Sequence, residues 1–464
     1  MMARTAAGRR RTVARTAEQI ARTDIGPRPV PPLMKVRASR VPAAESAVLD
    51  NGLRVVAVRR PGAPLVEVRL RIPFGGRTEL RAARAEVLAA SAMLGTADRD
   101  RFQVDMALAD LGAHLDTAVD PQRLLYSGSV LSNGLPDLLG LLTELLTSPA
   151  YRRRDVLGER DRLVEYLRLA KAQPGVVARM ALQHRRFGDH PAAWEMPDAE
   201  LVNTVGPAAV GGLHRRSVVP DGATLVLVGD LQPGKAVGLA AATLAGWAAD
   251  HPATTLATPP PITGGPVQLV HRNGSVQSQV RLTAPAVGRG SPDYAALQIA
   301  NLVFGGYFSS RLVENIREDK GYTYSAHSAI EFWPGTAAMT VSFDCATDAT
   351  AAALLETRYE LGRIALTAPG AAEVESARNY ALGSLAISLA TQAGYASTVS
   401  AIHGAGQDLQ WLRDHPARLA AVTADEVAAV SAKYLAPSAF TGVVVGDRGA
   451  VEASLQRLGD VDPG

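Results

Sequence analysis

Two segments of the sequence repeat one pattern at a distance of 217 residues. "VVPDGATLVLVGD" covers 218–230 and "LAPSAFTGVVVGD" covers 435–447. Each copy predicts a turn, an apolar strand and a Gly-Asp stop. A helical stretch precedes each copy, "VGPAAVGGLHRRS" in the first and "TADEVAAVSAKYL" in the second. In the second stretch Thr423 and Glu426 have the spacing of a capping box. A chain that repeats itself in this way is expected to fold as two similar units.

The starts of the two halves match more loosely. "LVEVRLRIPFGG" (65–76) precedes the helical run "RAEVLAASAML" (84–94), and "VQSQVRLTAPAVGRG" (276–290) precedes "YAALQIANLVF" (294–304). Each half therefore runs strand, helix, more strands, helices, final strand. Hairpin signals such as "WPG" at 333–335 favour antiparallel pairing. We expect an α+β fold with two homologous αβ domains, each a largely antiparallel sheet packed against helices.

Composition places the domain boundaries. The segment "ATPPPITGGP" at 257–266 is rich in proline and glycine and predicts a linker. The N-terminal domain is then expected at 44–256 and the C-terminal domain at 267–464. Residues 1–43 are expected to form a basic arm that is extended or disordered.

The charge of the chain is concentrated in that arm. Residues 1–40 carry ten Lys/Arg and two acids, so this segment is +8 while the whole chain is +3. The remaining residues are mildly acidic, which argues against a body that binds nucleic acid. The arm lacks the central apolar segment of a secretory signal peptide, so we do not expect it to be one. A weaker alternative is that the arm attaches the protein to a membrane or a nucleic acid.

Several kinds of chemistry are missing from the sequence. Cys345 is the single cysteine, so intrachain disulfides and cysteine metal clusters are excluded. No apolar stretch of 18 residues occurs, so no membrane span is expected and a cytoplasmic location is the default. No two of the nine histidines are four residues apart, which excludes HExxH and HxxEH. His190 in "FGDHP" reads as a turn or packing residue, with a functional role as the alternative.

Arg317 and Tyr324 form the most informative local pattern. "SSRLVENIRE" (309–318) has Leu312, Val313 and Ile316 on one helical stripe, and Asp319-Lys320-Gly321 predicts a turn. "YTYSAHSAI" then alternates as a strand, with Tyr322, Tyr324, Ala326, Ser328 and Ile330 expected on one face. "AMTVSFDC" predicts the next strand, with Met339, Val341, Phe343 and Cys345 on one face. The arginine and the tyrosine are therefore expected to lie close together.

These two side chains have chemistry that suits a peptide. An arginine fork can grip a peptide carbonyl or a carboxylate. A tyrosine hydroxyl can donate to an oxyanion that develops on a scissile carbonyl. The alternative is an exposed arginine beside a half-buried strand tyrosine. Gly305 and Gly306, just upstream, allow a close approach of the backbone or simply turn the chain.

From about residue 46 to its C-terminus the sequence resembles the pitrilysin/insulinase family of zinc peptidases. It is most similar to the two-domain bacterial branch that is related to mitochondrial processing peptidase. The resemblance includes "LDNGLRVV" (49–56), "FGDHP" (187–191), the segment 218–230 and "SSRLVENIREDKGYTYSAHS" (309–328). The last is the most specific, because the family's arginine–tyrosine pair falls on Arg317 and Tyr324.

The sequence departs from the family at its catalytic motif. HxxEH belongs on the first domain's early helix, where this chain reads "EVLAASAMLGT" (86–96). If the family's "GT" ending is matched to Gly95-Thr96, the histidines become Glu86 and Ala90 and the catalytic glutamate becomes Ala89. The family's third zinc ligand, a downstream glutamate, falls on Glu165. A catalytic zinc site needs three protein ligands and an open position, so no metal is expected in this chain.

Glu165 also has an ordinary interpretation. It lies in "GERDRLVEYLR" with Arg160, Arg162 and Arg168 around it, which is typical of a solvated, salt-bridged helix face.

The resemblance implies a role in a pair of chains. In some members one subunit carries HxxEH and zinc, and the other lacks them and supplies the arginine and the tyrosine. This sequence fits the second kind, with zinc in a homologous HxxEH partner and Arg317 and Tyr324 holding a peptide substrate. The expected architecture is half of a clam-like chamber that takes short or unfolded peptides, and removal of a leader peptide is one such reaction. The alternative is an inactive scaffold or peptide-binding protein of the same fold.

Overall fold

The computed structural model describes residues 16–21 and 42–462. Residues 1–41 and 42–464 are separate units, and within the first the structure describes one short helix, α1 (Ala17–Ala21). The prediction of an extended or disordered arm otherwise lies outside the described residues. None of the helices in the described ranges is both long and apolar enough to cross a bilayer.

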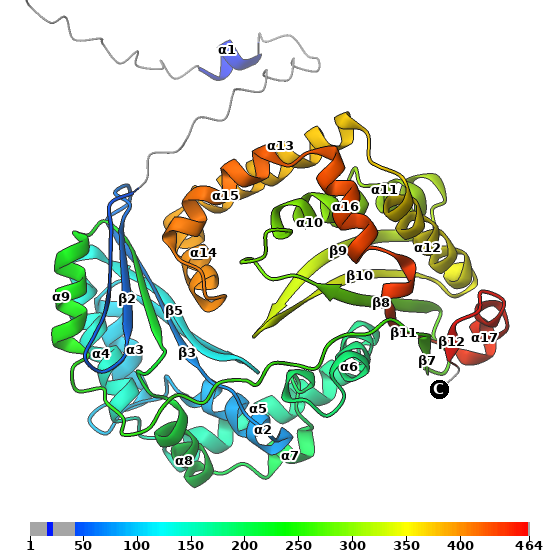
Figure 1. The fold of residues 1–464 in the computed structure, drawn as a ribbon. Coiled ribbons are helices and arrows are strands. Elements are labelled where there is room, and N and C mark those ends of the chain that lie inside the picture. The colour runs from blue at the N-terminus through cyan, green and yellow to red at the C-terminus, as the bar shows by residue number, and fades with distance from the viewer. Residues whose placement is uncertain (1–15, 22–41, 463–464) are drawn as a thin grey trace, which may run out of the picture. The chain divides into compact units, whose positions relative to one another are not determined.

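The first sheet is built from strands of the N-terminal half (Figure 1). Its order is β1-β2-β6-β3-β5-β4. β2 and β6 pair in parallel, and the other neighbours pair antiparallel. The strands are β1 (Ala44–Val48), β2 (Arg54–Arg59), β3 (Leu65–Pro73), β4 (His114–Asp120), β5 (Arg123–Leu131) and β6 (Thr224–Gly229).

The second sheet repeats this plan with strands of the C-terminal half. Its order is β12-β7-β11-β8-β10-β9, so β7, β11, β8, β10 and β9 take the places of β2, β6, β3, β5 and β4. The predicted repeat and the largely antiparallel sheets are thus confirmed. The strands are β7 (Val267–His271), β8 (Gln277–Ala286), β9 (Thr323–Trp333), β10 (Thr336–Ala346), β11 (Thr441–Gly446) and β12 (Val461–Asp462).

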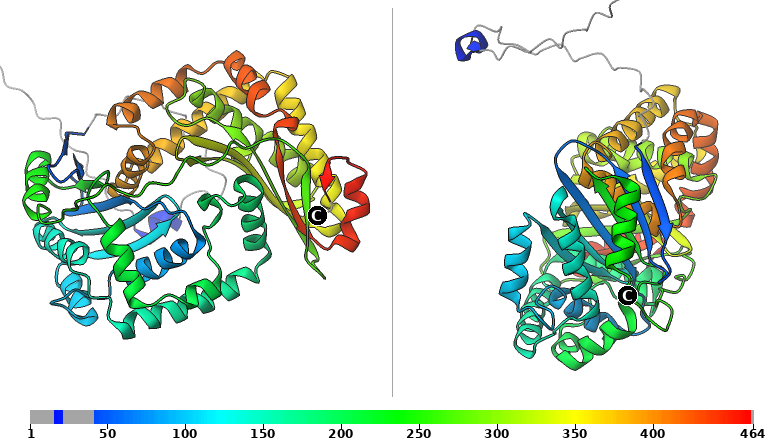
Figure 2. Two further views of the ribbon diagram at one scale, coloured as in Figure 1. Left: turned by 60° about the horizontal axis from the view of Figure 1, so that its bottom comes forward. Right: turned by 90° about the vertical axis from the view of Figure 1, so that its left-hand side faces the viewer.

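Helices cover one face of each sheet with segments of its own half. In the N-terminal half, α9 lies along β2, as the right-hand view of Figure 2 shows. The helices of this half are α2 (Glu79–Ser91), α3 (Arg101–Asp110), α4 (Leu135–Thr147), α5 (Arg153–Lys171), α6 (Pro174–Phe187), α7 (Ala199–Asn203), α8 (Pro207–Ser217) and α9 (Pro233–Thr243), with 3-10 turns η1 (Ser132–Gly134) and η2 (Pro191–Ala193).

The helices of the C-terminal half include two π-helical segments, η3 (Leu302–Gly306) and η4 (Glu314–Asp319). The predicted capping box of α16 is present, because Thr423 Oγ1 accepts from the Glu426 N–H and Glu426 Oε2 accepts from the Thr423 N–H. The remaining helices are α10 (Tyr294–Asn301), α11 (Arg311–Val313), α12 (Thr350–Leu366), α13 (Ala371–Ser388), α14 (Gln392–Gly404), α15 (Leu409–Ala421), α16 (Ala424–Tyr434) and α17 (Arg448–Gln456), with 3-10 turns η5 (Thr347–Ala349) and η6 (Pro437–Ala439).

Each half also lends one helix to the other half's sheet. α14 packs on β3 and β6, and α6 packs on β8 and β11 (Figures 1 and 2). On β6, Val226 and Val228 contact the α14 side and Leu225 and Leu227 belong to the other core, so every residue of this strand is buried. This explains why the repeated segments are continuous apolar runs rather than alternating ones. The division into domains around a linker at 257–266 stays a prediction.

Candidate functional site

Arg317 lies in the last turn of a helix that changes from α to π geometry. α11 leads directly into η4, and Leu312 and Ile316 anchor this segment in the second core with no exposed surface. The Lys320 N–H donates to the Asn315 carbonyl, five residues back, at 3.0 Å. Gly321 then turns the chain with a φ of +64°. The predicted helix and turn are confirmed, and the π geometry was not foreseen. Such wide turns are frequent at functional sites.

Tyr324 lies in a β-bulge at the start of β9. Ala326 pairs with Phe343 and Thr323 pairs with Cys345, so two residues of β9, Tyr324 and Ser325, stand opposite one residue of β10. The Thr323 hydroxyl holds the bulge, lying 2.6 Å from the Asp344 carbonyl and accepting from the Ser325 N–H. A bulge redirects the side chains next to it.

The bulge overturns one expectation about this strand. Tyr324 does not share the face of Ala326 and Ser328, because the extra residue breaks the alternation, and its ring is 88% exposed. Ser328 is buried. At the start of the strand, however, the buried residue is Thr323 and not Tyr324. On β10 the alternation holds, and all four residues expected on its buried face, Met339, Val341, Phe343 and Cys345, lie in the core.

The structure brings Arg317 and Tyr324 together. The Arg317 Cζ lies 5.5 Å from the centre of the Tyr324 ring and 4.7 Å from that of Phe308, which is 60% exposed. The arginine therefore lies against two aromatic rings. Phe308 was missed in the sequence, although "YFSSR" puts an aromatic residue directly before the helix.

Both polar groups of this cluster remain available to a ligand. Arg317 Nη1 lies 3.4 Å from Glu318 Oε1, an exposed pair that contributes little. No residue in the described part of the chain forms a hydrogen bond with the Tyr324 hydroxyl. A planar fork and a hydroxyl donor thus lie side by side and could hold a carbonyl or an oxyanion.

The glycine pair before α11 permits a close approach of the backbone. A Cβ on Gly305 would lie 2.8 Å from Ser328 Oγ, and a Cβ on Gly306 would lie 2.7 Å from Asn301 Nδ2. Of the two interpretations of this pair, close approach is the one that the structure supports. The π-helix η3 can therefore pack directly on β9, the strand that carries Tyr324.

The residues that the resemblance aligns with the family's zinc motif, 86–90, lie in the C-terminal half of α2. Glu86 lines a small cavity together with Asp120, Trp194 and Glu195. Burial raises the pKa of the Glu86 carboxyl to about 7, and the nearby Asp120 carboxylate adds to this shift. Ala89 is buried in the core, and its carbonyl accepts a hydrogen bond from the Thr117 hydroxyl at 2.7 Å.

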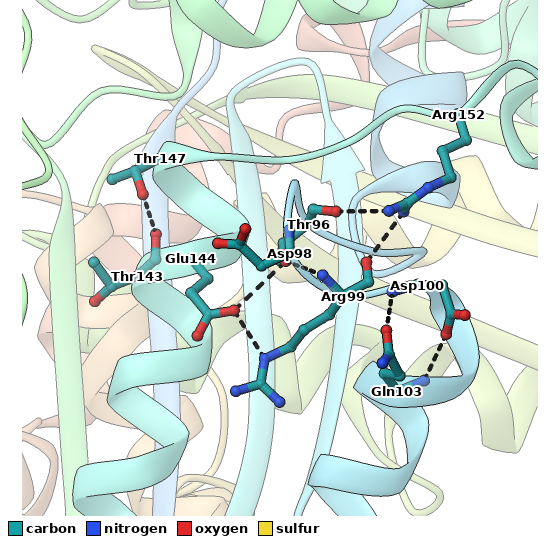
Figure 3. A network of polar contacts seen from close by, with 9 residues as sticks. All are labelled: Thr96, Asp98, Arg99, Asp100, Gln103, Thr143, Glu144, Thr147 and Arg152. Carbon is teal, nitrogen blue, oxygen red and sulfur yellow. Dashed lines mark hydrogen bonds and ion pairs between the residues drawn. The ribbon is translucent and has the colours of Figure 1, made fainter.

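The chain after α2 is held by a polar network (Figure 3). Gly95 has a φ of +134°, and the Thr96 hydroxyl accepts from the Arg99 N–H at 3.0 Å. Arg99 Nε pairs with Glu144 of α4 at 3.0 Å, and Arg152 donates to the Thr96 carbonyl. Gly95 and Thr96 therefore have a structural role in this segment.

Glu165 has the ordinary role that its surroundings predicted. Its side chain is 68% exposed, and Oε1 accepts from Arg168 Nη1 at 2.9 Å. The second fork nitrogen of Arg168 binds Glu200. Arg160 and Arg162, which were expected to share in this cluster, pair instead with Asp161 and Glu159.

The residues that the resemblance aligns with the zinc motif do not fit a zinc ion. Ala89 and Ala90 offer no ligand atom, and Glu165 is bound to an arginine at the surface. Across residues 16–21 and 42–462, no group of three or more His, Cys, Asp or Glu is placed to hold a metal.

His190 is a capping residue. Its Nδ1 accepts from the Ala192 N–H at 3.1 Å at the start of η2. Burial lowers the pKa of its ring. The turn interpretation of "FGDHP" is confirmed.

Two sequence models of one peptidase family match the chain. The first, described as insulinase (peptidase family M16), matches residues 54–196, and the second, described as peptidase M16 inactive domain, matches 209–380. This chain belongs to peptidase family M16. The two M16 matches cover both halves, and the second contains Arg317 and Tyr324.

The relatives of this chain include a protein named as a protease and a protein named as a subunit of a larger complex. A protein of Mycobacterium tuberculosis named uncharacterized zinc protease is 25% identical over 439 residues, which cover 92% of this chain and 99% of that one. Human cytochrome b-c1 complex subunit 1 is 26% identical over 273 residues, covering 58% of this chain and 56% of that subunit.

Solved structures share the M16 fold. A protease from Helicobacter pylori superimposes with a TM-score of 0.79 at 18% identity and covers 87% of this chain and all of that one. A structure from Pseudomonas fluorescens described as a peptidase M16 inactive domain gives a TM-score of 0.78 at 21% identity, over 87% and 98% of the two chains.

Proposed function

We propose that this chain is the zinc-free subunit of a heterodimeric metallopeptidase. One observation carries the proposal: HxxEH is absent, while the Arg317 Cζ lies 5.5 Å from the centre of the Tyr324 ring and the arginine's one ion pair, with Glu318, is exposed. A protein that had lost its function altogether would have no reason to keep an exposed tyrosine on a bulge. The partner would be a homologous chain that holds zinc through HxxEH.

In this role the two residues act on a substrate peptide bound at the partner's metal. Arg317 grips a peptide carbonyl or carboxylate with its fork. The Tyr324 hydroxyl donates to the oxyanion that forms on the scissile carbonyl. The substrate class is short or unfolded peptides, with leader removal from a ribosomally made peptide as the specific case, and the location is the cytoplasm.

The experiment compares three samples against a set of unstructured peptides. They contain this chain alone, an HxxEH homologue encoded beside it alone, and an equimolar mixture, with zinc measured in each. We expect cleavage in the mixture alone and zinc in the homologue alone. Cleavage by the homologue at the same rate without this chain, or no complex between the two on gel filtration, would contradict the proposal.

The second candidate is a scaffold or peptide-binding protein of the same fold. The match to cytochrome b-c1 complex subunit 1, a subunit of a larger complex by its name, favours it. A scaffold has no use for an oxyanion donor, so replacement of Tyr324 by phenylalanine separates the two candidates.

A further inference from the structure

A second cavity, with a volume of about 490 Å³, lies on the N-terminal half between the start of α2, the end of α8 and the loop after α9. Four arginines line it, Arg77, Arg81, Arg84 and Arg216, and His251 adds a fifth basic side chain. No aspartate or glutamate belongs to the lining. The site thus concentrates positive charge in a half of the chain that is neutral overall, with 24 Lys/Arg and 24 Asp/Glu in residues 42–256.

Within residues 16–21 and 42–462, none of these four arginines forms an ion pair. The carboxylates next to the lining are engaged elsewhere. Glu79 Oε1 accepts from the Asp198 N–H at 3.1 Å, and Asp221 Oδ2 accepts from the Ala253 N–H at 3.1 Å. Arg99 and several other arginines of this half have an acidic partner, whereas the four that line this cavity have none among the described residues, so their charges are not neutralised there.

Arg81 is built into the cavity wall. Its Cζ lies 4.4 Å from the centre of the Phe74 ring, and its Nη2 donates to the Ser217 hydroxyl at 3.3 Å. The Arg81 side chain lies directly against Gly76. A Cβ on this glycine would lie only 2.3 Å from the Arg81 Cδ. Burial lowers the pKa of the Arg81 guanidinium to about 10, with Arg216 as the second cause, so this group is still charged at neutral pH.

Arg216 brings a second positive charge toward Arg81. It follows Gly212 by one helical turn, and its Nη1 lies 3.2 Å from where a Cβ of that glycine would be. Two guanidinium groups that approach each other without an acid between them repel, and burial strengthens the repulsion. An anion between them would remove this unfavourable term, and most of the donors of both forks are free to bind it.

The geometry points to a phosphate compound as the ligand. Guanidinium forks bind phosphate oxygens in pairs, and several unneutralised arginines favour an anion with more than one charge. The volume is in the range of small-molecule sites, and Leu213 and Pro252 offer apolar wall for an organic group. We propose that this cavity binds a small, soluble, multiply charged phosphate, either a pyrophosphate or an organic phosphate ester.

This site is independent of the proposed peptidase role, because its lining includes neither Arg317 nor Tyr324. It does share Gly76, Thr78 and Arg81 with the smaller cavity around Glu86. A bound phosphate would therefore contact α2, the helix that carries Glu86.

The test is calorimetric titration of the full chain with sodium pyrophosphate at constant ionic strength. We expect saturable binding with one site per chain. Arg216→Gln should weaken it about 10-fold to 100-fold, as expected for the loss of a charge-assisted partner. Arg216 is exposed, so this variant should fold, which thermal unfolding without ligand verifies.

Arg215→Gln is the matched control. Arg215 lies over Gly211 as Arg216 lies over Gly212, but it does not line the cavity. Removing it takes away the same charge from the same helix turn, and the affinity should stay within about twofold. The comparison also corrects for weak binding to the basic segment 1–40, which is identical in both variants.

Four results would overturn the proposal. The first is the absence of saturable pyrophosphate binding, and the second is an equal loss of pyrophosphate affinity in the Arg216 and Arg215 variants. The third is binding of octaglutamate as tight as that of pyrophosphate, which would indicate an acidic peptide as the ligand. The fourth is Arg216-dependent sedimentation with phosphatidic acid vesicles in the absence of pyrophosphate binding, which would make the ligand a lipid headgroup.

Discussion

The two halves of the molecule carry different side chains at equivalent places of their shared topology. In each half a helical segment ends at a glycine with positive φ, and an edge strand follows. The glycines are Gly112, with a φ of +56°, before β4 and Gly321, with a φ of +64°, before β9. In the C-terminal half Arg317 lies four residues before this glycine and Tyr324 three residues after it.

The N-terminal half has leucines at the same two distances. Leu108 packs against the first core, and Leu115 is 5% exposed. β4 pairs with β5 in continuous register from His114 to Asp120, whereas β9 contains a bulge. One topology thus yields two apolar side chains of the core in one half and an arginine beside an exposed tyrosine in the other. The difference lies in two local irregularities, the π turn and the bulge, rather than in the arrangement of strands.

Tyr324→Phe gives the largest expected effect on this comparison. If the hydroxyl donates to an oxyanion, the rate of the mixture with the HxxEH partner should fall about 10²-fold to 10³-fold. The stability should not change, because the ring is 88% exposed. Steady-state cleavage kinetics and thermal unfolding measure the two quantities.

Tyr359→Phe is the control for that experiment. Tyr359 is 59% exposed on α12, and its loss of a hydroxyl should leave the rate unchanged. Equal cleavage rates for wild type and the Tyr324 variant would mean that the Tyr324 hydroxyl takes no part in cleavage. The tyrosine would then have no more chemical role than Leu115, its counterpart in the N-terminal half.

Alanine substitutions at the equivalent strand positions should have very different effects on stability. Leu115→Ala removes a buried side chain at a sheet edge and should lower the free energy of unfolding by about 2–3 kcal/mol. Tyr324→Ala should change it by less than about 0.5 kcal/mol, since this side chain lies outside the core. Urea unfolding measures both. Comparable losses in the two variants would show that the tyrosine has a structural role after all.

Glu86→Gln tests the shifted carboxyl on α2 of the N-terminal half. The folded pKa is raised from 4.5 to about 7, so the fold favours the protonated carboxyl. Stability should therefore be unaffected below pH 4.5, fall as the pH rises from 4.5 to 7, and remain reduced above pH 7. The upper limit is roughly 3 kcal/mol, and because the side chain is partly exposed we expect roughly 1–2 kcal/mol.

The glutamine variant should accordingly be more stable than wild type at pH 8 and equal to it at pH 4. Glu165→Gln is the control, because it removes a carboxylate that is 68% exposed, and its effect should stay within about 0.5 kcal/mol at both pH values. A gain for Glu86→Gln that is the same at pH 4 and pH 8 would contradict the raised pKa.

The repeat, the helix and strand types and the proximity of Arg317 to Tyr324 could all be predicted, because each depends on local pattern. Apolar runs at 224–229 and 441–446 bury both faces of a strand, and the turn at Gly321 needs a positive φ. These constraints act within a few residues of the chain and are visible in one sequence.

The bulge at Tyr324 and the cavity around Arg81 could not be predicted. The bulge depends on the register that β10 imposes on β9 and on a contact between Thr323 and Asp344, 21 residues away. The cavity joins α2, α8 and the loop after α9, so its arginines, Arg81 and Arg216 among them, are 135 residues apart in sequence. Both features come from tertiary contacts that single-sequence periodicity does not contain.

Phe308→Leu should have the smallest effect and sharpens the comparison further. The ring lies against the Arg317 guanidinium, and an exposed cation–π contact contributes about 0.5–1 kcal/mol. We therefore expect KM in the mixture to rise about threefold with little change in kcat, because the arginine is less well placed to bind the peptide. Phe102→Leu is the control, since Phe102 is 70% exposed on α3, the segment of the N-terminal half that corresponds to α11 and η4. A change in kcat alone, or the same change in both variants, would mean that Phe308 does not position Arg317, and the Tyr324 ring would then be its one aromatic support among the described residues.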